Sequence, residues 1–308
     1  MFSGLSRLNM ILRGFTVDLE QQFEGVLQLI DNHLNENLSL ERLAAEAGVP
    51  LNHFEFIFYS LYHTQVVDYI ALLRNIAAAQ TLGFDKSVSI LEVATAAGYS
   101  STVEFTQAFT ASIGQTPQAF RQAPDWANFF IKQQPLKTLS QGHNTLTDAD
   151  VNIEIIQLDK VDLVLIKHRG PKVYLPQTIQ ALIAFRKTHQ LRLLDNRTFN
   201  FVYCLPQNMT MNYAIDIGVS VPTAKLSDLQ VVMADSEYFK ASAMPTGTYA
   251  TFVHKGSEIA LQGKISYLYS IWLAKNNFTL TEHPLTFERF DLTDTIDDVH
   301  VKVYLAVS

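Results

Sequence analysis

Apolar residues recur at helical spacing through the first third of the chain. Phe23, Val26, Ile30 and Leu34 are three or four residues apart, and similar spacing continues to about Phe120. No stretch in this region alternates between apolar and polar residues, as a half-buried strand would. The pattern therefore predicts an all-helical first domain.

Three polar residues mark the expected starts of helices in this domain. Asn52, Ser89 and Ser101 are each followed three residues later by a glutamate. A side chain at the N-cap accepts a hydrogen bond from the backbone of the first turn, and the glutamate reaches back to the N-cap amide. We therefore expect helices to start near residues 52, 89 and 101.

One spacing occurs twice in the helical domain. Each copy has a short apolar pair, then a glycine, then two aromatics. The first copy is Leu43-Ala44, Gly48, Phe54 and Phe58, and the second, fifty residues later with one residue added after the glycine, is Val93-Ala94, Gly98, Phe105 and Phe109. Glycine adopts a positive φ at little cost, so each copy predicts a helix, a tight turn and a second helix. The domain is expected to hold two helix-turn-helix units.

The pattern changes near residue 124. Residues 124–150 lack periodicity and are rich in polar and turn residues, which is typical of a linker. Alternating or β-branched runs follow at 151–158, 161–167, 199–205, 213–221, 248–254 and 300–307, with helical stretches at 177–189 and 260–275. These runs predict an α+β second domain.

The second domain also repeats, with an offset of 86 residues. His168-Arg169-Gly170 returns as His254-Lys255-Gly256, Phe201 as Phe287, and the strand centred on Asp216 as the strand centred on Lys302. Two such modules related by a pseudo-twofold axis are expected to leave a groove at their junction, where small molecules often bind.

Composition supports a folded protein of two domains. The chain has 308 residues, of which 48% are hydrophobic and 17% charged, which is ordinary for globular proteins. Its one cysteine, Cys204, cannot form an internal disulfide, and no apolar run approaches the roughly 20 residues that span a bilayer. We therefore expect a cytoplasmic protein with no membrane segment, whose residues 1–20 form a loose arm.

The net charge of −7 lies in the helical domain. Between residues 21 and 125 there are four basic residues and eleven acidic ones, and the rest of the chain is balanced. The four basic residues are Arg42, Arg74, Lys86 and Arg121. An acidic domain is repelled by nucleic-acid phosphates unless its few cations are well placed.

Two resemblances are carried by longer motifs. Residues 38–121, with LERLAAEAGV, ILEVATAAGYSSTVEFTQAF and IGQTPQAFR, closely resemble the AraC-type double helix-turn-helix domain. Residues 151–307, with KHRGP, GTYATFVHKG and PLTFERF, resemble the GyrI-like effector-binding domain. The resemblance implies a multi-domain transcription regulator that binds specific DNA sequences under the control of a small molecule. It divides the chain into an arm (1–20), a helix-turn-helix domain (21–125), a linker (126–150) and a GyrI-like domain (151–308).

The resemblance assigns DNA recognition to residues 52–62 and 101–111. The candidate DNA-binding residues are Asn52, His53, Thr102, Thr106 and Gln107, with Arg74 and Arg121 as structural or backbone-contacting cations. Neither segment contains a lysine or an arginine, and Tyr59-Ser60 and Thr110-Ala111 stand where the family pattern expects basic pairs.

This departure leaves a second reading of the helical domain open. An acidic domain with exposed Phe56 and Tyr59 would suit the binding of another protein or a second copy of the chain, after loss of DNA binding. The alternative for these two aromatics is the helical core.

In the second domain, aromatic rings and one acid are the candidate ligand-binding residues. They are Tyr174, Tyr203, Tyr249, Tyr269, Trp272 and Glu288. Rings with a buried carboxylate suit flat apolar cations. The competing readings are that the aromatics form core and that Glu288 forms a surface ion pair with Arg289.

Lys302 is a further candidate, because the family usually has an acid at its position. By the offset it corresponds to Asp216, and we expect the two to face each other across the pseudo-twofold. Such a replacement would favour neutral or anionic ligands. Otherwise Lys302 extends into solvent from an edge strand.

Some relatives of the second domain are hydrolases that use a carboxylate with a tyrosine. Glu288 with Tyr203 or Tyr249 would be the corresponding group here, although their spacing does not demand it. We find no metal-ligand cluster and no glycine-rich phosphate loop, and Cys204 is expected to be an inert core thiol. The sequence thus predicts a regulator that is not an enzyme and needs no cofactor or metal, with DNA and a small-molecule effector as partners.

Overall fold

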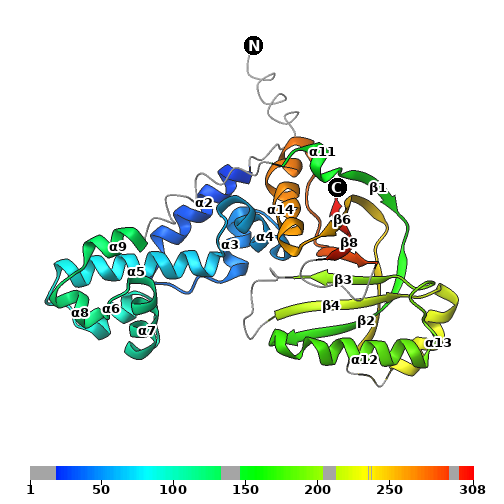
Figure 1. Ribbon diagram of the computed structural model, residues 1–308, viewed down its shortest axis with the longest axis horizontal. Coiled ribbons are helices and arrows are strands. Elements are labelled where there is room, and N and C mark those ends of the chain that lie inside the picture. Colours follow the sequence, from blue (N-terminus) through cyan, green and yellow to red (C-terminus); the bar gives the residue numbers. More distant parts are fainter. Residues whose placement is uncertain (1–18, 133–145, 204–212, 235, 237, 291–297) are drawn as a thin grey trace, which may run out of the picture. The chain divides into compact units, whose positions relative to one another are not determined.

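The computed structural model describes residues 19–132, 146–203, 213–234, 236, 238–290 and 298–308 (Figure 1). The chain divides into two compact units, residues 1–143 and 144–308. Cys204, residues 1–18 of the expected arm and residues 133–145 of the expected linker lie outside the described residues.

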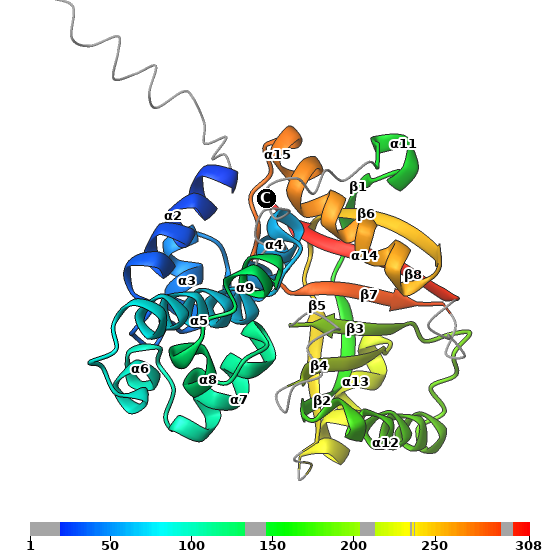
Figure 2. The same cartoon turned by 60° about the vertical axis from the view of Figure 1, so that its left-hand side comes forward.

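The first unit is helical, as predicted. Its helices are α2 (Leu19–Asn32), α3 (Leu40–Ala47), α4 (Leu51–Tyr62), α5 (Val66–Phe84), α6 (Ile90–Ala96), α7 (Thr102–Ile113), α8 (Pro117–Gln122) and α9 (Trp126–Lys132). The long helix α5 runs between a group formed by α2 to α4 and a group formed by α6 to α9 (Figures 1 and 2). Each group contains one of the two predicted helix-turn-helix units.

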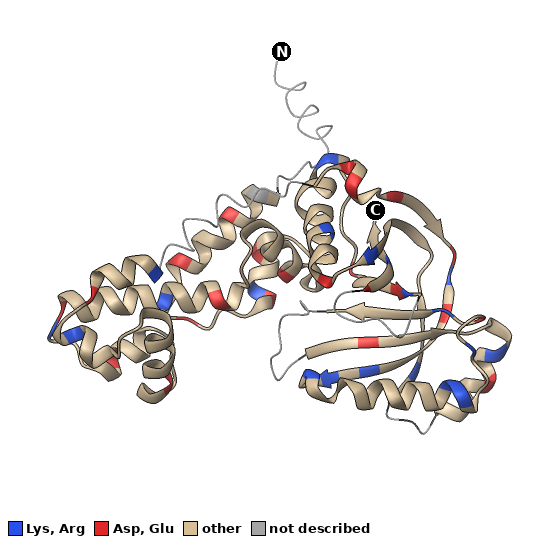
Figure 3. Cartoon of the chain, in the orientation of Figure 1, with Lys and Arg blue, Asp and Glu red and all other residues tan. Residues whose placement is uncertain are grey.

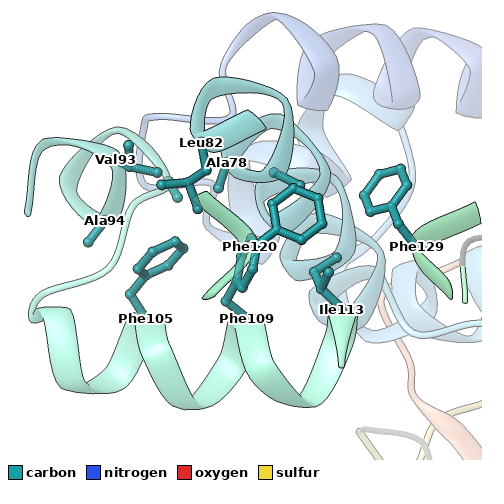
Figure 4. Close-up of a cluster of buried hydrophobic side chains, with 11 residues drawn as sticks. Ala78, Leu82, Val93, Ala94, Phe105, Phe109, Ile113, Phe120 and Phe129 are labelled. Carbon is teal, nitrogen blue, oxygen red and sulfur yellow. The ribbon is translucent and has the colours of Figure 1, made fainter. Parts of the chain in front are cut away.

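The core of the second helical group is largely aromatic. Phe105, Phe109 and Ile113 point from α7 toward Phe120, and all four are buried (Figure 4). Phe109 and Phe120 meet edge to face with ring centroids 5.7 Å apart, a favoured aromatic geometry. The buried face of α7 is therefore fixed against α8, which leaves its opposite face for other contacts.

The helical unit extends past residue 125, where the sequence predicted the linker to begin. Phe129 on α9 is buried in the same core, and the ring of Trp126 lies 5.1 Å from that of Phe120. Residues 126–132 are therefore part of this unit. The sequence prediction overlooked this helix of seven residues, because polar residues flank it. The helix contains three aromatics, Trp126, Phe129 and Phe130.

The second unit is α+β, as predicted. After α11 (Asp148–Val151) its strands are β1 (Glu154–Leu158), β2 (Val161–Gly170), β3 (Thr198–Val202), β4 (Tyr213–Ser220), β5 (Phe239–Met244), β6 (Gly247–Gly256), β7 (Leu285–Arg289) and β8 (Val299–Val307). They form one antiparallel sheet in the order β1-β6-β8-β7-β3-β4-β2-β5. Its helices are η1 (Lys172–Tyr174), α12 (Leu175–Thr188), α13 (Thr223–Met233), α14 (Glu258–Tyr267), the π-helical turn η2 (Leu268–Trp272) and α15 (Leu273–Asn276).

The internal repeat is present, and its edge strands are exchanged. Strands β1 to β4 correspond to β5 to β8. However, β1 pairs with β6 of the second repeat, and β5 pairs with β2 of the first. Both pairings have the same register. Glu154 lies opposite Thr251 in the first pairing, and their equivalents under the 86-residue offset, Lys240 and Leu165, lie opposite each other in the second. Each repeat thus completes the sheet of the other.

The predicted offset of 86 needs one correction. It holds for β2 with β6 and for β4 with β8, but β3 and β7 differ by 87 residues. Gln190 and Asn277, which both have left-handed φ angles, also differ by 87. A π-helical turn accommodates one extra residue in a helix, and η2 lies just before Asn277, so we attribute the shift to it.

This single residue changes which side chains correspond. Successive residues of a strand point to opposite faces, so a shift of one exchanges the two faces. The residue equivalent to Phe201 is therefore Glu288 and not Phe287, as the uniform offset predicted. A carboxylate in the second repeat occupies the position that a phenyl ring occupies in the first.

The sheet has two different faces. Helix α12 packs on β2, and α14 packs on β6 (Figures 1 and 2). On β2, His168 faces α12, where its Nδ1 lies 2.9 Å from the hydroxyl of Thr178. The residues that alternate with it point to the other side, which we call the open face. Leu165, Phe201, Tyr249 and Tyr304 form an apolar cluster there.

Two of the elements that the sequence analysis did not predict are α13 and β5. The residues of β5, FKASAM, include three small side chains and a lysine, so they lack the apolar alternation that predicts a strand. The strand forms because β2 offers it a complete ladder of partners from Val161 to Ile166.

Candidate functional site

The two turns of the helix-turn-helix units depend on glycine, as predicted. Gly48 has a φ of 63° and Gly98 a φ of 77°, where other residues are strained. A Cβ atom at residue 98 would lie 2.8 Å from Cζ of Arg74. The second turn therefore needs glycine both for its backbone conformation and for the close approach of the Arg74 guanidinium.

The predicted helix starts are confirmed in part. Glu92 and Ser89 form the expected reciprocal pair, in which the Glu92 amide donates to Ser89 Oγ at 3.2 Å and the Ser89 amide to Glu92 Oε2 at 2.7 Å. Ser101 caps α7, although the Glu104 carboxylate accepts from the Ser100 hydroxyl. Helix α4 begins at Leu51, close to the predicted start near residue 52, but its N-cap is Pro50 and not Asn52.

Helix α7 presents a polar and apolar surface opposite its buried aromatics. Gln107 and Glu104 are exposed, and Thr102 and Thr106 are half-buried. Val103, which the sequence analysis did not select, is 66% exposed. Glu104 is the one charged residue of this helix (Figure 3). Val103 could have been identified from the sequence, because it is an apolar residue in the first turn of the helix that does not fall on the face of Phe105 and Phe109.

The hydroxyls of the candidate Thr106 and of its neighbour Thr110 already have backbone partners. Thr106 donates to the carbonyl of Thr102, and Thr110 donates to the carbonyl of Thr106, both at 2.6 Å. A hydroxyl oxygen keeps lone pairs that can accept a further hydrogen bond. The side-chain amide of Gln107, with two donors and one acceptor, is thus the most versatile group on this surface.

Helix α4 corrects the expectation for His53 and bears out the core reading of Phe56. His53 is fully buried, so it does not lie on a surface that could meet DNA. Phe56 is only 2% exposed, and Tyr59 is half-buried. Helix α4 is broadly apolar, and six of its residues, 53, 54, 56, 57, 58 and 60, are buried. Asn52 is half-buried at the start of the helix and remains the candidate polar residue there.

Each of the four basic residues between 21 and 125 has an acceptor inside the unit. Arg42 forms an ion pair of 2.7 Å with Glu36. Arg74 donates to the carbonyls of Leu34 and Glu36. Arg121 donates to the carbonyl of Val88, and Lys86 donates to the carbonyl of Arg121. Arg74 and Arg121 therefore connect segments of this unit.

On the open face of the sheet, two acids are each held by a tyrosine and a cation. Asp216 on β4 is 2% exposed. It accepts a hydrogen bond of 3.0 Å from the Tyr203 hydroxyl and one of 2.6 Å from Arg169 Nη1. The Arg169 guanidinium also lies 5.0 Å from the centroid of the Tyr203 ring. Burial is the main reason why the pKa of Tyr203 rises to about 12, with the Asp216 charge adding to it.

The second acid is Glu288 on β7, which is 6% exposed. Its Oε2 accepts a hydrogen bond of 2.5 Å from the Tyr304 hydroxyl, and Arg197 Nη1 lies 3.6 Å away. The expectation of a surface ion pair with Arg289 was wrong, because neighbouring residues of one strand point to opposite faces. Burial first, and then the bond to Glu288, raise the pKa of Tyr304 above its usual value.

Lys302 lies beside this second pair. It is opposite Glu288 in the ladder between β7 and β8, and its Nζ lies 5.5 Å from the Tyr304 ring centroid. It corresponds to Asp216, as predicted, but the two do not face each other, because β7 and β3 lie between their strands. β8 is also an interior strand, so Lys302 does not extend from a sheet edge.

A pocket of about 500 Å³ opens beside Tyr249 and His283, and Thr248, Thr281 and Ala306 also line it. The His283 ring meets the rings of Phe201 and Tyr249 edge to face, with centroids 5.5 and 6.1 Å away. Burial lowers the pKa of His283 to about 4, so the ring is neutral at pH 7. His283 could not be identified from the sequence, since a single histidine in a loop carries no signal.

The structure brings four of the seven predicted ligand residues to this face: Tyr203, Tyr249, Glu288 and Lys302. Tyr269 and Trp272 belong instead to η2 in the helical layer, where Tyr269 is fully buried and Trp272 stacks on Phe278 at 5.6 Å. Tyr174 lies in η1 and is 53% exposed. The suggested grouping of Glu288 with Tyr203 or Tyr249 is not present as a hydrogen-bonded pair, because the tyrosine that donates to Glu288 is Tyr304.

Among the described residues, no helix is both long and apolar enough to cross a membrane. Within the same ranges, no three His, Cys, Asp or Glu side chains are grouped so that they could hold a metal ion.

Curated relatives match about a third of the chain. The right origin-binding protein of Escherichia coli strain K12 is 31% identical over 103 residues, which are 33% of this chain and 35% of that protein. Transcriptional regulator Rob of Salmonella typhimurium strain LT2 is 30% identical over the same shares. The probable transcription factor PqrA of Proteus vulgaris is 29% identical over 105 residues, which are 33% of this chain and 85% of PqrA. The match thus spans about a third of the first two relatives.

Among solved structures, one match is the DNA-binding domain of AdpA in complex with a target DNA. The matched region is 34% of this chain and 91% of the AdpA chain, at 28% identity and a TM-score of 0.31. A hydrolase from Listeria innocua covers 51% of this chain and 91% of its own, at 12% identity and a TM-score of 0.39.

Two family models match the chain. A helix-turn-helix domain matches residues 43–123, and the GyrI-like small molecule binding domain matches residues 151–308. The second match covers more than half of the chain. The chain therefore belongs to the GyrI-like family, with an AraC-type helix-turn-helix domain preceding its small molecule binding domain.

Proposed function

We propose that this protein is a transcription regulator that binds DNA through its helical unit and responds to a small molecule bound by its sheet. The observation that carries this proposal is the arrangement of α7. Its aromatic face is buried in the core of the helical unit, and its opposite face, with Val103 and Gln107, is exposed. The second helix of a helix-turn-helix unit reads base edges in the major groove.

The chemistry of α7 suits recognition of A·T pairs. A glutamine amide pairs with N6 and N7 of adenine, and an apolar side chain contacts the thymine methyl group. Gln107 and Val103 lie four residues apart, on the same side of the helix. Thr102 and Thr106 complete this surface, and Asn52 offers one amide on α4.

Phosphate contacts are expected to contribute little. All four basic residues between 21 and 125 have acceptors inside the unit, so few cations remain to displace counterions from DNA. Selectivity would then come mainly from base contacts, at about 1 to 3 kcal/mol for each good pair. The mobility-shift experiment also tests the alternative reading, in which the helical unit binds a protein and not DNA.

The open face is the proposed effector site. Its two buried acids are already compensated, Asp216 by Arg169 and Tyr203, and Glu288 by Tyr304 and Arg197. With Lys302 beside them, neither of these two acids is left as an uncompensated carboxylate for a cationic ligand. We therefore propose a neutral or anionic effector. The curated relatives are transcription regulators, which argues against an enzyme.

A mobility-shift experiment at low salt tests the proposal. The probe is a duplex from the promoter of the protein's own gene, and the variant is Gln107→Ala. A matched control is Gln118→Ala, since Gln118 is also exposed but lies on α8. The proposal predicts a shift by the native protein that weakens only with Gln107→Ala. No shift at micromolar protein would support the alternative reading instead.

A further inference from the structure

A second pocket lies on the other side of the sheet, in the helical layer of the first repeat. It has a volume of about 810 Å³ and lies at the C-terminal end of α12 and the start of α13. Four basic residues line it, and Asp195 is the one acid in its lining. The four are Arg186, Lys187, Arg192 and Lys225. A concave surface lined mostly by one sign of charge concentrates ions of the other sign.

Arg186 is the most unusual of these residues, because it is 7% exposed and has neutral partners. Its guanidinium donates to the carbonyls of Leu191 and Asn196 and to the Thr198 hydroxyl, at 2.7 to 3.0 Å. No carboxylate among the described residues lies within ion-pair distance of it. Buried charges are normally compensated by an opposite charge.

The remaining contacts leave the excess of positive charge in place. Arg192 pairs with Asp195 at 2.8 Å. Lys225 donates to the backbone carbonyl of His189 at 2.6 Å, which is again a neutral partner. The positive charges of Arg186, Lys187 and Lys225 are therefore not balanced by acids in the lining of this pocket.

The second repeat shows that the fold itself does not need these charges. Past η2 the offset between the repeats is 87 residues, so the counterparts of Arg186, Lys187 and Arg192 are Leu273, Ala274 and Thr279. Leu273 is buried like Arg186, at 4% exposure. The same module thus folds with uncharged residues at all three places, and the cations of the first repeat call for another explanation.

We propose that this pocket binds a small phosphorylated molecule. A phosphate monoester carries nearly two negative charges at pH 7, which matches three unbalanced cations better than the single charge of a carboxylate. Arginine and lysine are the side chains that most often bind phosphate. The apolar residues Ile183, Leu191 and Pro222 of the same lining would contact the organic part of the ligand.

Phenyl phosphate is a suitable probe, because it combines a dianion with an apolar ring. Binding to the full-length protein is measured by isothermal titration calorimetry at constant ionic strength, next to benzoate and benzyl alcohol. We expect saturable binding of phenyl phosphate, weaker binding of benzoate and none of benzyl alcohol. Absence of saturable phenyl phosphate binding at millimolar concentration, or tighter binding of benzoate, would overturn the proposal.

Two variants with opposite charge changes locate the site. Lys187→Gln is expected to weaken phenyl phosphate binding about tenfold, and Asp195→Asn to strengthen it, because each shifts the charge of the pocket by one unit. Lys240→Gln is the matched control, since Lys240 is an exposed lysine on β5 outside the lining. Equal effects of Lys187→Gln and Lys240→Gln would show that the probe responds only to net charge, and the pocket would be excluded.

Discussion

Tyr304 donates a hydrogen bond of 2.5 Å to Glu288, and both side chains are buried on the open face of the sheet. The first repeat has a similar pair, Tyr203 with Asp216, at 3.0 Å. The two pairs use different strands, because the acid lies on β4 in the first repeat and on β7 in the second. The two repeats therefore hold their buried acids at positions that do not correspond, and the open face is not symmetric.

Removal of the Tyr304 hydroxyl is expected to destabilise the sheet unit. Tyr304→Phe leaves the buried Glu288 carboxylate with Arg197 at 3.6 Å as its remaining recorded partner. A hydrogen bond to a charged group contributes about 1.5 to 3 kcal/mol, and we expect a loss of that size in the free energy of unfolding. Urea unfolding followed by fluorescence measures it in a Trp126→Phe background, where Trp272 is the remaining tryptophan.

Tyr238→Phe is the control for this experiment, because Tyr238 is 69% exposed. It should change the unfolding free energy by less than about 0.5 kcal/mol. Equal small effects of the two substitutions would mean that the Glu288–Tyr304 bond adds nothing to stability.

Because of His283, the free energy of unfolding is expected to depend on pH in the acid range. Its pKa is about 4 in the folded protein because it is buried, and about 6.5 in an unfolded chain. Between these values the unfolded chain binds more protons, so stability falls as the pH drops from 6.5 toward 4. We expect this histidine to account for a loss of about 2 kcal/mol between pH 7 and pH 5.

The variant His283→Gln isolates this contribution. Its unfolding free energy should change less between pH 7 and pH 5 than that of the parent, again with Trp272 as the reporter. An identical change in the two proteins would show that His283 titrates normally and is not enclosed by Phe201 and Tyr249.

Gly98 is expected to tolerate no other residue. Gly98→Ala combines a φ of 77° with a Cβ atom 2.8 Å from Arg74 Cζ, so it should destabilise the helical unit by about 1 to 3 kcal/mol. Gly25→Ala in α2 is the matched control, because its Cβ would make an ordinary contact at 3.6 Å. A helix interior favours alanine over glycine, so thermal unfolding should rank Gly25→Ala at or above the native protein and Gly98→Ala well below it.

The salt dependence of DNA binding follows from the internal partners of the basic residues. The logarithm of the binding constant falls with the logarithm of salt concentration by about 0.9 for each phosphate neutralised. We expect a slope no steeper than about −3, measured by fluorescence anisotropy from low to moderate salt. A slope near −6 would mean that the four basic residues give up their acceptors inside the helical unit and contact DNA phosphates instead. These residues are Arg42, Arg74, Lys86 and Arg121.

Much of the fold could be predicted from the sequence because its signals are local. Helical spacing, the caps at Ser89 and Ser101, and the glycines at 48 and 98 are each properties of a few adjacent residues. The apolar strands of the second domain were equally readable. Strand β5 was not, because its pairing with β2 is a contact between residues about eighty positions apart.

The candidate sites were less predictable, because burial and strand register are properties of the whole fold. His53 looked like a polar surface residue, yet the rest of α4 carries it inward. The partner of Glu288 could not be read from its neighbour Arg289, since the register places Tyr304 within reach. The uniform offset of 86 failed at β7 because a π-helical turn, invisible in the residue pattern, adds one residue.

Selection from a randomised pool of DNA duplexes tests the central claim most directly. The native protein, incubated at low salt, should enrich one sequence that contains an A·T step, and Gln107→Ala should fail to enrich it while Gln118→Ala recovers it. If the native protein enriches no sequence, the exposed face of α7 does not read DNA and the assignment as a regulator is wrong.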